Sequence, residues 1–414
     1  MLELTVGPVA NGGWCVSRHE GRVVFVRHAL PGERVLARVT EETTRFLRAD
    51  AVEILEPSPD RVTPPCPFSG PGRCGGCDWQ HAAPAAQRRF KAEVIAEQLQ
   101  RLAGITRDVV VEEVPGTPGG LGWRTRVQFA ADRDGRLGLR RHRSHEIERV
   151  DACLIAHPDI EDLRVSTEGW RGAATVEFIA ATGGDRAVIV TPKPHRDVRI
   201  PDLDASVMLD EGRRGTRVLR GKGTLVEHVG DRDYRVSASG FWQVHPAAAA
   251  TLQGAVLDFA QPKPGEWALD LYCGVGLFAA ALAEAVGPTG AVLGIESEPP
   301  AVQDARHNLR DLPQAQTERG KVEEALDRLD IAQADLVVCD PPRAGLGRPV
   351  VARIASLTPT RIVYVSCDPA TLSRDLNWFA ELGYELAELR AFDQYPMTHH
   401  VECVALLTQS VGQD

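Results

Sequence analysis

Three side chains able to do chemistry stand at or inside apolar runs in the last third of the chain. Cys367 follows the strand-like run RIVYVS, and Asp340 follows ADLVVC. Such positions meet at the carboxyl edge of an open α/β sheet, where ligands bind. A thiolate there would be a nucleophile, although a lone cysteine at a strand end is by default a buried core residue. Glu402 interrupts the apolar run VECVALL, which favours a functional carboxylate over a surface one.

A glycine-rich turn follows the strand-like run EWALDLYC. Gly274 and Gly276 would let a ligand approach the backbone, and about twenty residues later Glu296 could accept both ribose hydroxyls. This pairing fits either NAD or S-adenosylmethionine. The turn Asp340-Pro-Pro-Arg343 favours the methyl donor, because Asp-Pro-Pro turns occur at this place in nucleic-acid methyltransferases. Arg343, where tyrosine would indicate an exocyclic amine, favours methylation of carbon.

The pattern of elements predicts a multidomain chain. Residues 241–414 alternate strand-like and helix-like runs, which predicts an α/β Rossmann-like domain with a final pair of strands. Residues 1–56 alternate with period two between turn signals, which predicts a small five-stranded β-barrel. Residues 57–240 are mostly strand-like and predict a central, mostly β domain. Its one long helical run, 84–103, could pack on the catalytic domain.

Four of the nine cysteines have a pattern suited to a metal centre. The total of nine cysteines is odd and the N-terminus has no secretory pattern, which argues against a full set of disulfides. Close spacing and loop-rich flanks suit thiolates that converge on one centre, with the fourth ligand from the distant run DACLIAH. An iron–sulfur cluster and a zinc ion both fit this spacing. The candidate ligands are Cys66, Cys74, Cys77 and Cys153.

The charge balance restricts how a polyanion could be bound. Forty-seven basic and 57 acidic residues give a formal net charge of -10, so any nucleic acid must be held by a local patch. Residues 121–149 carry eight arginines against four acidic residues, and the interleaved Trp123 and Phe129 could stack on splayed bases. A solvated face is the plainer interpretation of such a run. The absence of a long apolar run predicts a cytoplasmic protein without membrane contact.

The motifs DLYCGVGLF, DPPRAG, SCDP and HHVECVALL, in this order and spacing, resemble those of the RNA 5-methyluridine (uracil-C5) methyltransferase family. Members of this family act on a uridine of 23S rRNA or of tRNA. The resemblance extends to the run GFWQV, to the cysteine cluster and to a TRAM/OB-like N-terminal barrel. It implies S-adenosylmethionine as the cofactor, with binding residues Gln243, Tyr272, Glu296 and Asp340.

The same resemblance implies a role for each candidate catalytic residue. Carbon 5 of uracil is too weak a nucleophile to attack the sulfonium methyl, so the Cys367 thiolate would first add to carbon 6. Glu402 would then remove the proton at carbon 5 before the thiolate leaves. The form CGGCxxQ is similar to the ribosomal branch, which favours a 4Fe-4S cluster over zinc and 23S rRNA over tRNA. Leu277 stands where many members have asparagine, and a side-chain contact to the donor is expected to be missing there.

Three other classes of protein compete with this interpretation. An NAD-dependent oxidoreductase would use the glycine turn, but it leaves DPPR, SCDP and the clustered cysteines unexplained. A non-catalytic RNA-binding iron–sulfur protein would not need Cys367 or Glu402. A cytosine-C5 methyltransferase would commonly place its cysteine after proline, whereas Ser366 precedes Cys367 here. The sequence implies no obligate protein partner and identifies neither the target uridine nor the oligomeric state.

Overall fold

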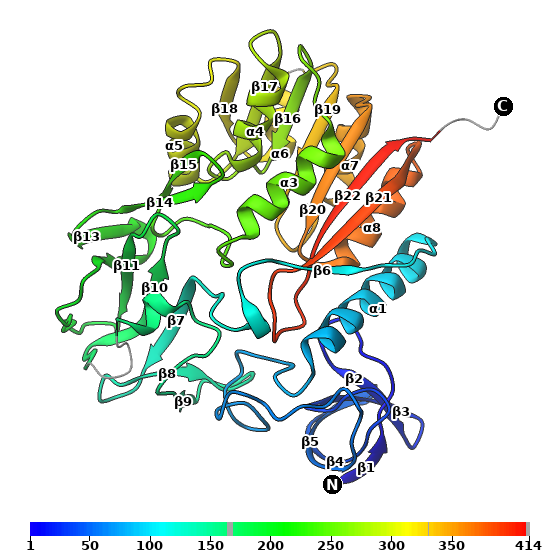
Figure 1. The fold of residues 1–414 in the computed structure, drawn as a ribbon, viewed down its shortest axis with the longest axis vertical. Coiled ribbons are helices and arrows are strands. Elements are labelled where there is room, and N and C mark those ends of the chain that lie inside the picture. Colours follow the sequence, from blue (N-terminus) through cyan, green and yellow to red (C-terminus); the bar gives the residue numbers. More distant parts are fainter. Residues whose placement is uncertain (164–168, 330, 411–414) are drawn as a thin grey trace.

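The computed structural model describes residues 1–163, 169–329 and 331–410 (Figure 1). The N-terminal five strands pair in the order β1-β4-β5-β3-β2 around one apolar core, and we call this unit the barrel. Alternating residues such as Val24 and Val26 on β3 point into that core, as the period-two pattern predicted. The strands are β1 (Leu2–Thr5), β2 (Cys15–His19), β3 (Arg22–Arg27), β4 (Arg34–Glu42) and β5 (Phe46–Glu56).

A seven-stranded sheet forms the middle of the molecule, in the order β13-β12-β11-β10-β7-β8-β9. One face of its central strands carries Val176 and Phe178, which pack around the buried Trp170. The elements are η1 (Pro118–Gly120), β7 (Arg126–Ala131), β8 (Leu137–Arg140), β9 (Ile147–Arg149), α2 (Pro158–Glu161), β10 (Ala173–Ala180), β11 (Arg186–Pro192), β12 (Ser206–Asp210), η2 (Gly212–Arg214) and β13 (Thr216–Arg220).

The C-terminal sheet has eight strands in the order β18-β17-β16-β19-β20-β22-β21-β6, and helices cover it (Figure 1). Strands β16 to β20 are parallel and β22 is antiparallel to both neighbours, so the predicted alternation and final strand pair are confirmed. The elements are α3 (Ala248–Ala260), β16 (Trp267–Leu271), α4 (Leu277–Val286), β17 (Ala291–Glu296), α5 (Pro299–Asn308), β18 (Ala315–Arg319), α6 (Val322–Arg328), β19 (Leu336–Cys339), α7 (Gly347–Ser356), β20 (Arg361–Ser366), α8 (Pro369–Ala380), β21 (Tyr384–Asp393) and β22 (Glu402–Gln409).

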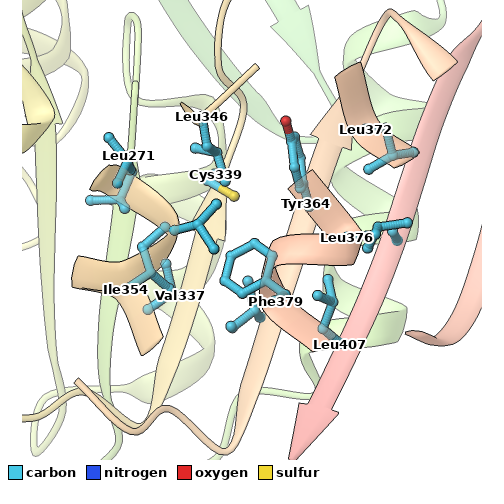
Figure 2. Close-up of a cluster of buried hydrophobic side chains, with 14 of the residues drawn as sticks. Leu271, Val337, Cys339, Leu346, Ile354, Tyr364, Leu372, Leu376, Phe379 and Leu407 are labelled. Carbon is cyan, nitrogen blue, oxygen red and sulfur yellow. The ribbon is translucent and has the colours of Figure 1, made fainter. Parts of the chain in front are cut away.

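Strand β19 is buried on both faces, because helices lie on each side of a parallel sheet. Figure 2 shows the core beneath α7 and α8, where Val337, Ile354 and Phe379 pack together. At its upper edge the Tyr364 hydroxyl donates to Asp375 at 2.8 Å, so this buried polar pair is satisfied. Among the described residues, no helix has both the length and the apolar character needed to cross a bilayer.

Two segments from the middle of the sequence are built into the C-terminal sheet. Helix α1 (Pro84–Ala103) packs on α8 and ends at Gly104, whose left-handed φ of 67° suits a C-cap. Strand β6 (Val111–Glu113) then pairs in parallel with β21. The hairpin of β14 (Thr224–Val229) and β15 (Arg232–Ser237) docks on α5 through the buried Asp304, which accepts from the backbone N–H of Ser237 at 2.6 Å.

Candidate active site

A cavity of about 220 Å³ opens at the carboxyl ends of β16, β17 and β19, where the strand order reverses. Its lining includes Tyr272 and Glu296, which stand at two of these strand ends, and Pro342 of the Asp-Pro-Pro turn. Asp340 follows β19, and its backbone N–H donates to Leu271 at 3.2 Å. The structure therefore brings three of the four expected cofactor residues to one edge of the sheet.

The glycine turn and Glu296 form one rigid unit. The Glu296 carboxylate accepts from the backbone N–H groups of Gly274 at 3.0 Å, Ser297 at 2.6 Å and Glu298 at 2.8 Å. Helix α4 starts from Gly276, whose φ of 90° is a conformation that glycine adopts without strain. The carboxylate is thus held in place beside the cavity before any ligand is bound.

The acidic groups at this edge fit a cationic cofactor. Burial and the negative charges of Asp340 and Glu296 raise the pKa of Asp270 well above its ordinary value. Burial also raises the pKa of Asp340 to about 7. A positive charge bound here would relieve this repulsion, as a sulfonium does, whereas an anionic dinucleotide phosphate would add to it.

Cys367 follows the last residue of β20, beside β22. Ser366 pairs with Cys403, so the continuing antiparallel register brings Cys367 alongside Glu402 on the same face. Burial, and then the negative charge of Glu402, raise the pKa of Cys367 to about 12, while Arg343 lowers it. The side chain is therefore a neutral thiol until its charge environment changes.

Glu402 is only 3% exposed. Burial and the nearby Asp340 raise its pKa well above the usual range, and Arg343 opposes that rise. Its Oε2 accepts from the hydroxyl of Tyr395 at 3.4 Å, and that hydroxyl accepts from Gln394 Nε2 at 3.3 Å. These contacts fix the orientation of the carboxyl group at the start of β22.

Gln243 belongs to the same network. Gln394 Nε2 donates to Gln243 Oε1 at 2.5 Å, which connects the loop after β15 to the segment that precedes Glu402. Of these two hydrogen-bonded glutamines, the sequence indicated Gln243 through the resemblance and gave no sign of Gln394. Leu277, at the first turn of α4, packs in the core, and its backbone O accepts from Tyr234 at 3.4 Å.

A second cavity, of about 150 Å³, contains Cys367. Lys91 of α1, Arg343 and His400 line it, together with residues 10–13, which connect β1 and β2 of the barrel. Arg343 Nη2 donates to His400 Nδ1 at 3.1 Å, so the guanidinium is held at the rim of this cavity. Sequence reasoning missed Lys91 and residues 10–13, because they come from parts of the chain far from Cys367. It gave His400 no role, although this residue lies in the motif HHVECVALL.

A buried ion pair positions the loop between β21 and β22. Lys91 Nζ donates to Asp393 Oδ1 at 2.5 Å and to the backbone O of Tyr395 at 3.1 Å. Burial lowers the pKa of Lys91, while the charge of Asp393 favours its ammonium form. The 302 positions that separate the two residues explain why no local pattern pointed to the pair.

The four candidate metal ligands share one neighbourhood. Burial, and to a smaller extent the nearby Cys153, Cys74 and Cys66, raise the pKa of Cys77 to about 12, and the hydrogen bond from Gln80 Nε2 at 3.4 Å opposes the rise. A donor set of four thiols suits an iron–sulfur cluster or zinc. Within the described ranges, however, no three cysteine, histidine or carboxylate side chains are close enough to hold a metal ion.

The expectation that Trp123 and Phe129 stack on RNA bases is wrong. They are 1% and 4% exposed. Phe129 lies on the inward face of β7, and Trp123 packs against Ile155 and Met397. The charge of the segment is also partly neutralised internally, since Arg149 pairs with Asp132 at 2.8 Å and Arg141 pairs with Glu146 and Glu148 at 2.8 and 3.1 Å.

Comparison with known proteins gives two family matches. Residues 213–410 match the family described as tRNA (Uracil-5-)-methyltransferase, and residues 1–52 match the TRAM domain. The chain is 58% identical over 421 residues to an uncharacterized RNA methyltransferase of Streptomyces coelicolor, covering 98% of this chain and 92% of the relative. It is 37% identical to an uncharacterized RNA methyltransferase of Bifidobacterium longum, covering 98% and 96%.

A solved structure has the same architecture over almost the whole chain. The tRNA (uracil-54, C5)-methyltransferase of Pyrococcus abyssi, in complex with S-adenosyl-L-homocysteine, superposes with a TM-score of 0.74. It is 25% identical and the match covers 98% of this chain and 100% of that one. Together with the sheet-edge cavity and its acidic lining, these matches show that the chain belongs to the RNA (uracil-5-)-methyltransferase family and is an RNA (uracil-C5)-methyltransferase that uses S-adenosylmethionine.

Proposed function

We propose that the chain forms 5-methyluridine through a transient covalent bond between Cys367 and carbon 6 of the target uracil. The observation that supports this most strongly is the pairing of Ser366 with Cys403, which sets the thiol beside Glu402. Cys367 also lines a cavity of about 150 Å³. Addition of the thiolate makes carbon 5 nucleophilic, and the bound S-adenosylmethionine supplies the methyl group. For these steps the Cys367 thiol must release its proton to solvent and Glu402 must be ionised, which the positive charges of Arg343 and of the bound donor favour. Glu402 then takes the proton from carbon 5, and the electron pair of that C–H bond expels the thiolate.

Different residues of the site have different roles in this reaction. Gln243, Tyr272, Glu296 and Asp340 would hold the methyl donor, in the roles that the resemblance implies. Arg343 favours the ionised forms of both Cys367 and Glu402, since its charge lowers the pKa of each. Tyr395 keeps the Glu402 carboxyl in one orientation. The base must be unstacked before the thiol can reach the face of its ring, so the target uridine is expected in a loop or as a flipped nucleotide.

We further propose 23S rRNA as the substrate in preference to tRNA, and the cytoplasm as the location. The form CGGCxxQ supports the ribosomal choice. The structural neighbour from Pyrococcus abyssi is named as a tRNA methyltransferase, so both RNAs must be compared as substrates.

The deciding experiment supplies the purified protein with S-adenosylmethionine and, separately, unmodified 23S rRNA and tRNA. Mass spectrometry then maps any 5-methyluridine. We expect methylation of one uridine in 23S rRNA, and none with Cys367→Ala, which should still bind S-adenosylhomocysteine. Cys15→Ala, which removes a buried barrel thiol, is the matched control and should stay active. Methylation by Cys367→Ala would refute the covalent route, and methylation of tRNA alone would refute the ribosomal preference.

Cys66, Cys74, Cys77 and Cys153 are proposed to hold a 4Fe-4S cluster, with zinc as the alternative. Support comes from the resemblance and from the proximity of these thiols, since the other three all act on the pKa of Cys77. Anaerobically prepared protein should contain iron and sulfide and show visible absorbance, and Cys74→Ser should lose both. If elemental analysis finds zinc and no iron, the site holds zinc in place of the cluster.

A further inference from the structure

The cavity that contains Cys367 has a wall from the barrel. Residues 10–13 line it together with Cys367, Arg343 and His400. These four residues belong to the connection between β1, which ends at Thr5, and β2, which begins at Cys15, and we call them the barrel turn. The barrel is therefore in contact with the candidate catalytic cavity, although more than 350 residues separate the turn from Cys367 along the chain.

The barrel turn fits closely against the loop that precedes Glu402. Gly13 has a φ of 81°, and a Cβ at this position would lie 2.6 Å from Cβ of His399. The indole Nε1–H of Trp79 donates to the backbone O of Gly13 at 3.1 Å. The turn is thus held from two sides, by a buried tryptophan and by close packing on His399.

His399 is itself fixed by the same segment that holds the turn. Its Nδ1 is 2.6 Å from Asp78 Oδ2, and the backbone N–H groups of Asp78 and Trp79 both donate to Met397, at 2.9 and 3.0 Å. A displacement of the barrel turn would therefore act on the loop that leads to Glu402. Asn11, exposed at the cavity, offers an amide donor and acceptor toward whatever enters.

We propose that the barrel turn forms part of the pocket for the flipped target nucleotide, so that the TRAM domain completes the active site of this protein. This inference rests on the proposed function, because it takes the occupant of the Cys367 cavity to be the uridine. Asn11 contacts the nucleotide, and Gly13 lets the turn approach closely enough for that contact. Flipped bases are read by such contacts in snug pockets.

The test uses the whole chain, S-adenosylmethionine and RNA transcripts that contain 5-fluorouridine. Fluorine leaves no proton for Glu402 to remove from carbon 5, so the Cys367 adduct should persist and be counted on a denaturing gel. The variants are Gly13→Ala, whose new Cβ meets His399, and Asn11→Ala, which truncates an exposed side chain and should not affect folding. Gly21→Ala is the matched control: its φ of 79° gives the same backbone strain in the same barrel, with nothing within 4 Å of the new Cβ.

At subsaturating RNA we expect Gly13→Ala to slow trapping by about tenfold or more, because small misplacements of a binding wall are costly. Asn11→Ala should slow it by about threefold, the effect of one lost hydrogen bond. All variants should bind S-adenosylhomocysteine as the wild type does, and Gly21→Ala should trap at the wild-type rate. Wild-type trapping rates in both Gly13→Ala and Asn11→Ala would overturn the inference. A wild-type protein that traps neither rRNA nor tRNA would instead overturn the proposed function.

Discussion

The surroundings of Cys367 and Glu402 oppose the ionisation of both side chains. Burial raises the pKa of each side chain, and the negative charge of Glu402 opposes ionisation of the thiol next to it. Two adjacent anions in a buried site would repel each other strongly, so ionisation of either side chain opposes ionisation of the other. Arg343 is a nearby cation that favours both ionised forms. Ionisation of Cys367 and Glu402 is therefore favoured by positive charge that is brought into the site.

Replacement of Glu402 by glutamine should trap the reaction after methyl transfer. The amide has almost the same shape but cannot accept the proton from carbon 5, so the thiolate cannot leave. We expect a covalent complex of protein and RNA that survives denaturation and carries the new methyl group. Gel mobility and mass spectrometry would measure it. Free 5-methyluridine at the wild-type rate from this variant would contradict the role of Glu402.

Asp340 should make the empty protein less stable as the pH rises. Because its folded-state pKa of about 7 lies above its ordinary value, the neutral carboxyl stabilises the fold at low pH, and this contribution is lost as pH rises through 7. Asp340→Asn is neutral throughout, so its melting temperature should exceed that of the wild type, and by more at pH 8 than at pH 5. Scanning calorimetry without ligand would measure the difference. An equal or lower melting temperature at pH 8 would be evidence against this charge penalty.

Helix α1 connects the middle of the sequence to the catalytic sheet. It packs on α8, and its Lys91 binds both Asp393 and the backbone of Tyr395, next to the loop that leads to Glu402. Strand β6, which follows the helix, extends the same sheet beside β21. Through these two elements, the segment 84–113 packs on α8 and extends the C-terminal sheet, although it lies in the middle domain by sequence position.

The ion pair between Lys91 and Asp393 can be tested by a double-mutant cycle. Lys91→Met leaves an uncompensated buried carboxylate, which should lower the free energy of unfolding by about 3–5 kcal/mol. Adding Asp393→Leu removes that charge, so the double variant should recover much of the loss. Urea unfolding would measure all four proteins. A loss below about 1 kcal/mol in the single variant would show that the pair behaves like an exposed one.

At the scale of the whole molecule, the barrel, α1 and the catalytic sheet meet at one cavity. The formal charge of -10 makes the protein as a whole repel RNA, so binding depends on where the arginines lie. Arg143 is exposed and its guanidinium lies 5.9 Å from the ring of Trp14, the residue that follows the barrel turn. Because Trp14 adjoins the barrel turn, we expect RNA bound there to reach this cation, which also pairs with Glu41 at 3.4 Å.

Arg143→Gln should weaken RNA binding in a way that depends on salt. If Arg143 neutralises a phosphate, its loss reduces the slope of log affinity against log salt by about one. Filter binding between low and moderate salt would measure the slope. Arg217→Gln, at an exposed arginine of β13 paired with Glu211 at 2.6 Å, is the control and should keep the wild-type slope. An unchanged slope in Arg143→Gln would exclude this phosphate contact.

The sequence by itself determined the local features of this protein. Apolar runs followed by polar or glycine residues marked the ends of β16, β19 and β20, because strand length and turn chemistry are properties of a few consecutive residues. That was sufficient to place Asp340 and Cys367 directly after strands of one parallel sheet. Tyr272 was placed inside the run EWALDLYC, whereas β16 ends one residue before it. The order of the motifs identified the family.

Only the tertiary structure decided which distant segments share a surface. Local periodicity showed that Trp123 and Phe129 lie among arginines. The burial of Trp123 depends on packing against Met397, and that of Phe129 on the core around Phe178. It gave no sign that the barrel turn or Lys91 reaches Cys367. The pKa values of Cys367 and Glu402 follow from the same packing, since desolvation and the approach of another carboxylate are set by all the chain around a residue.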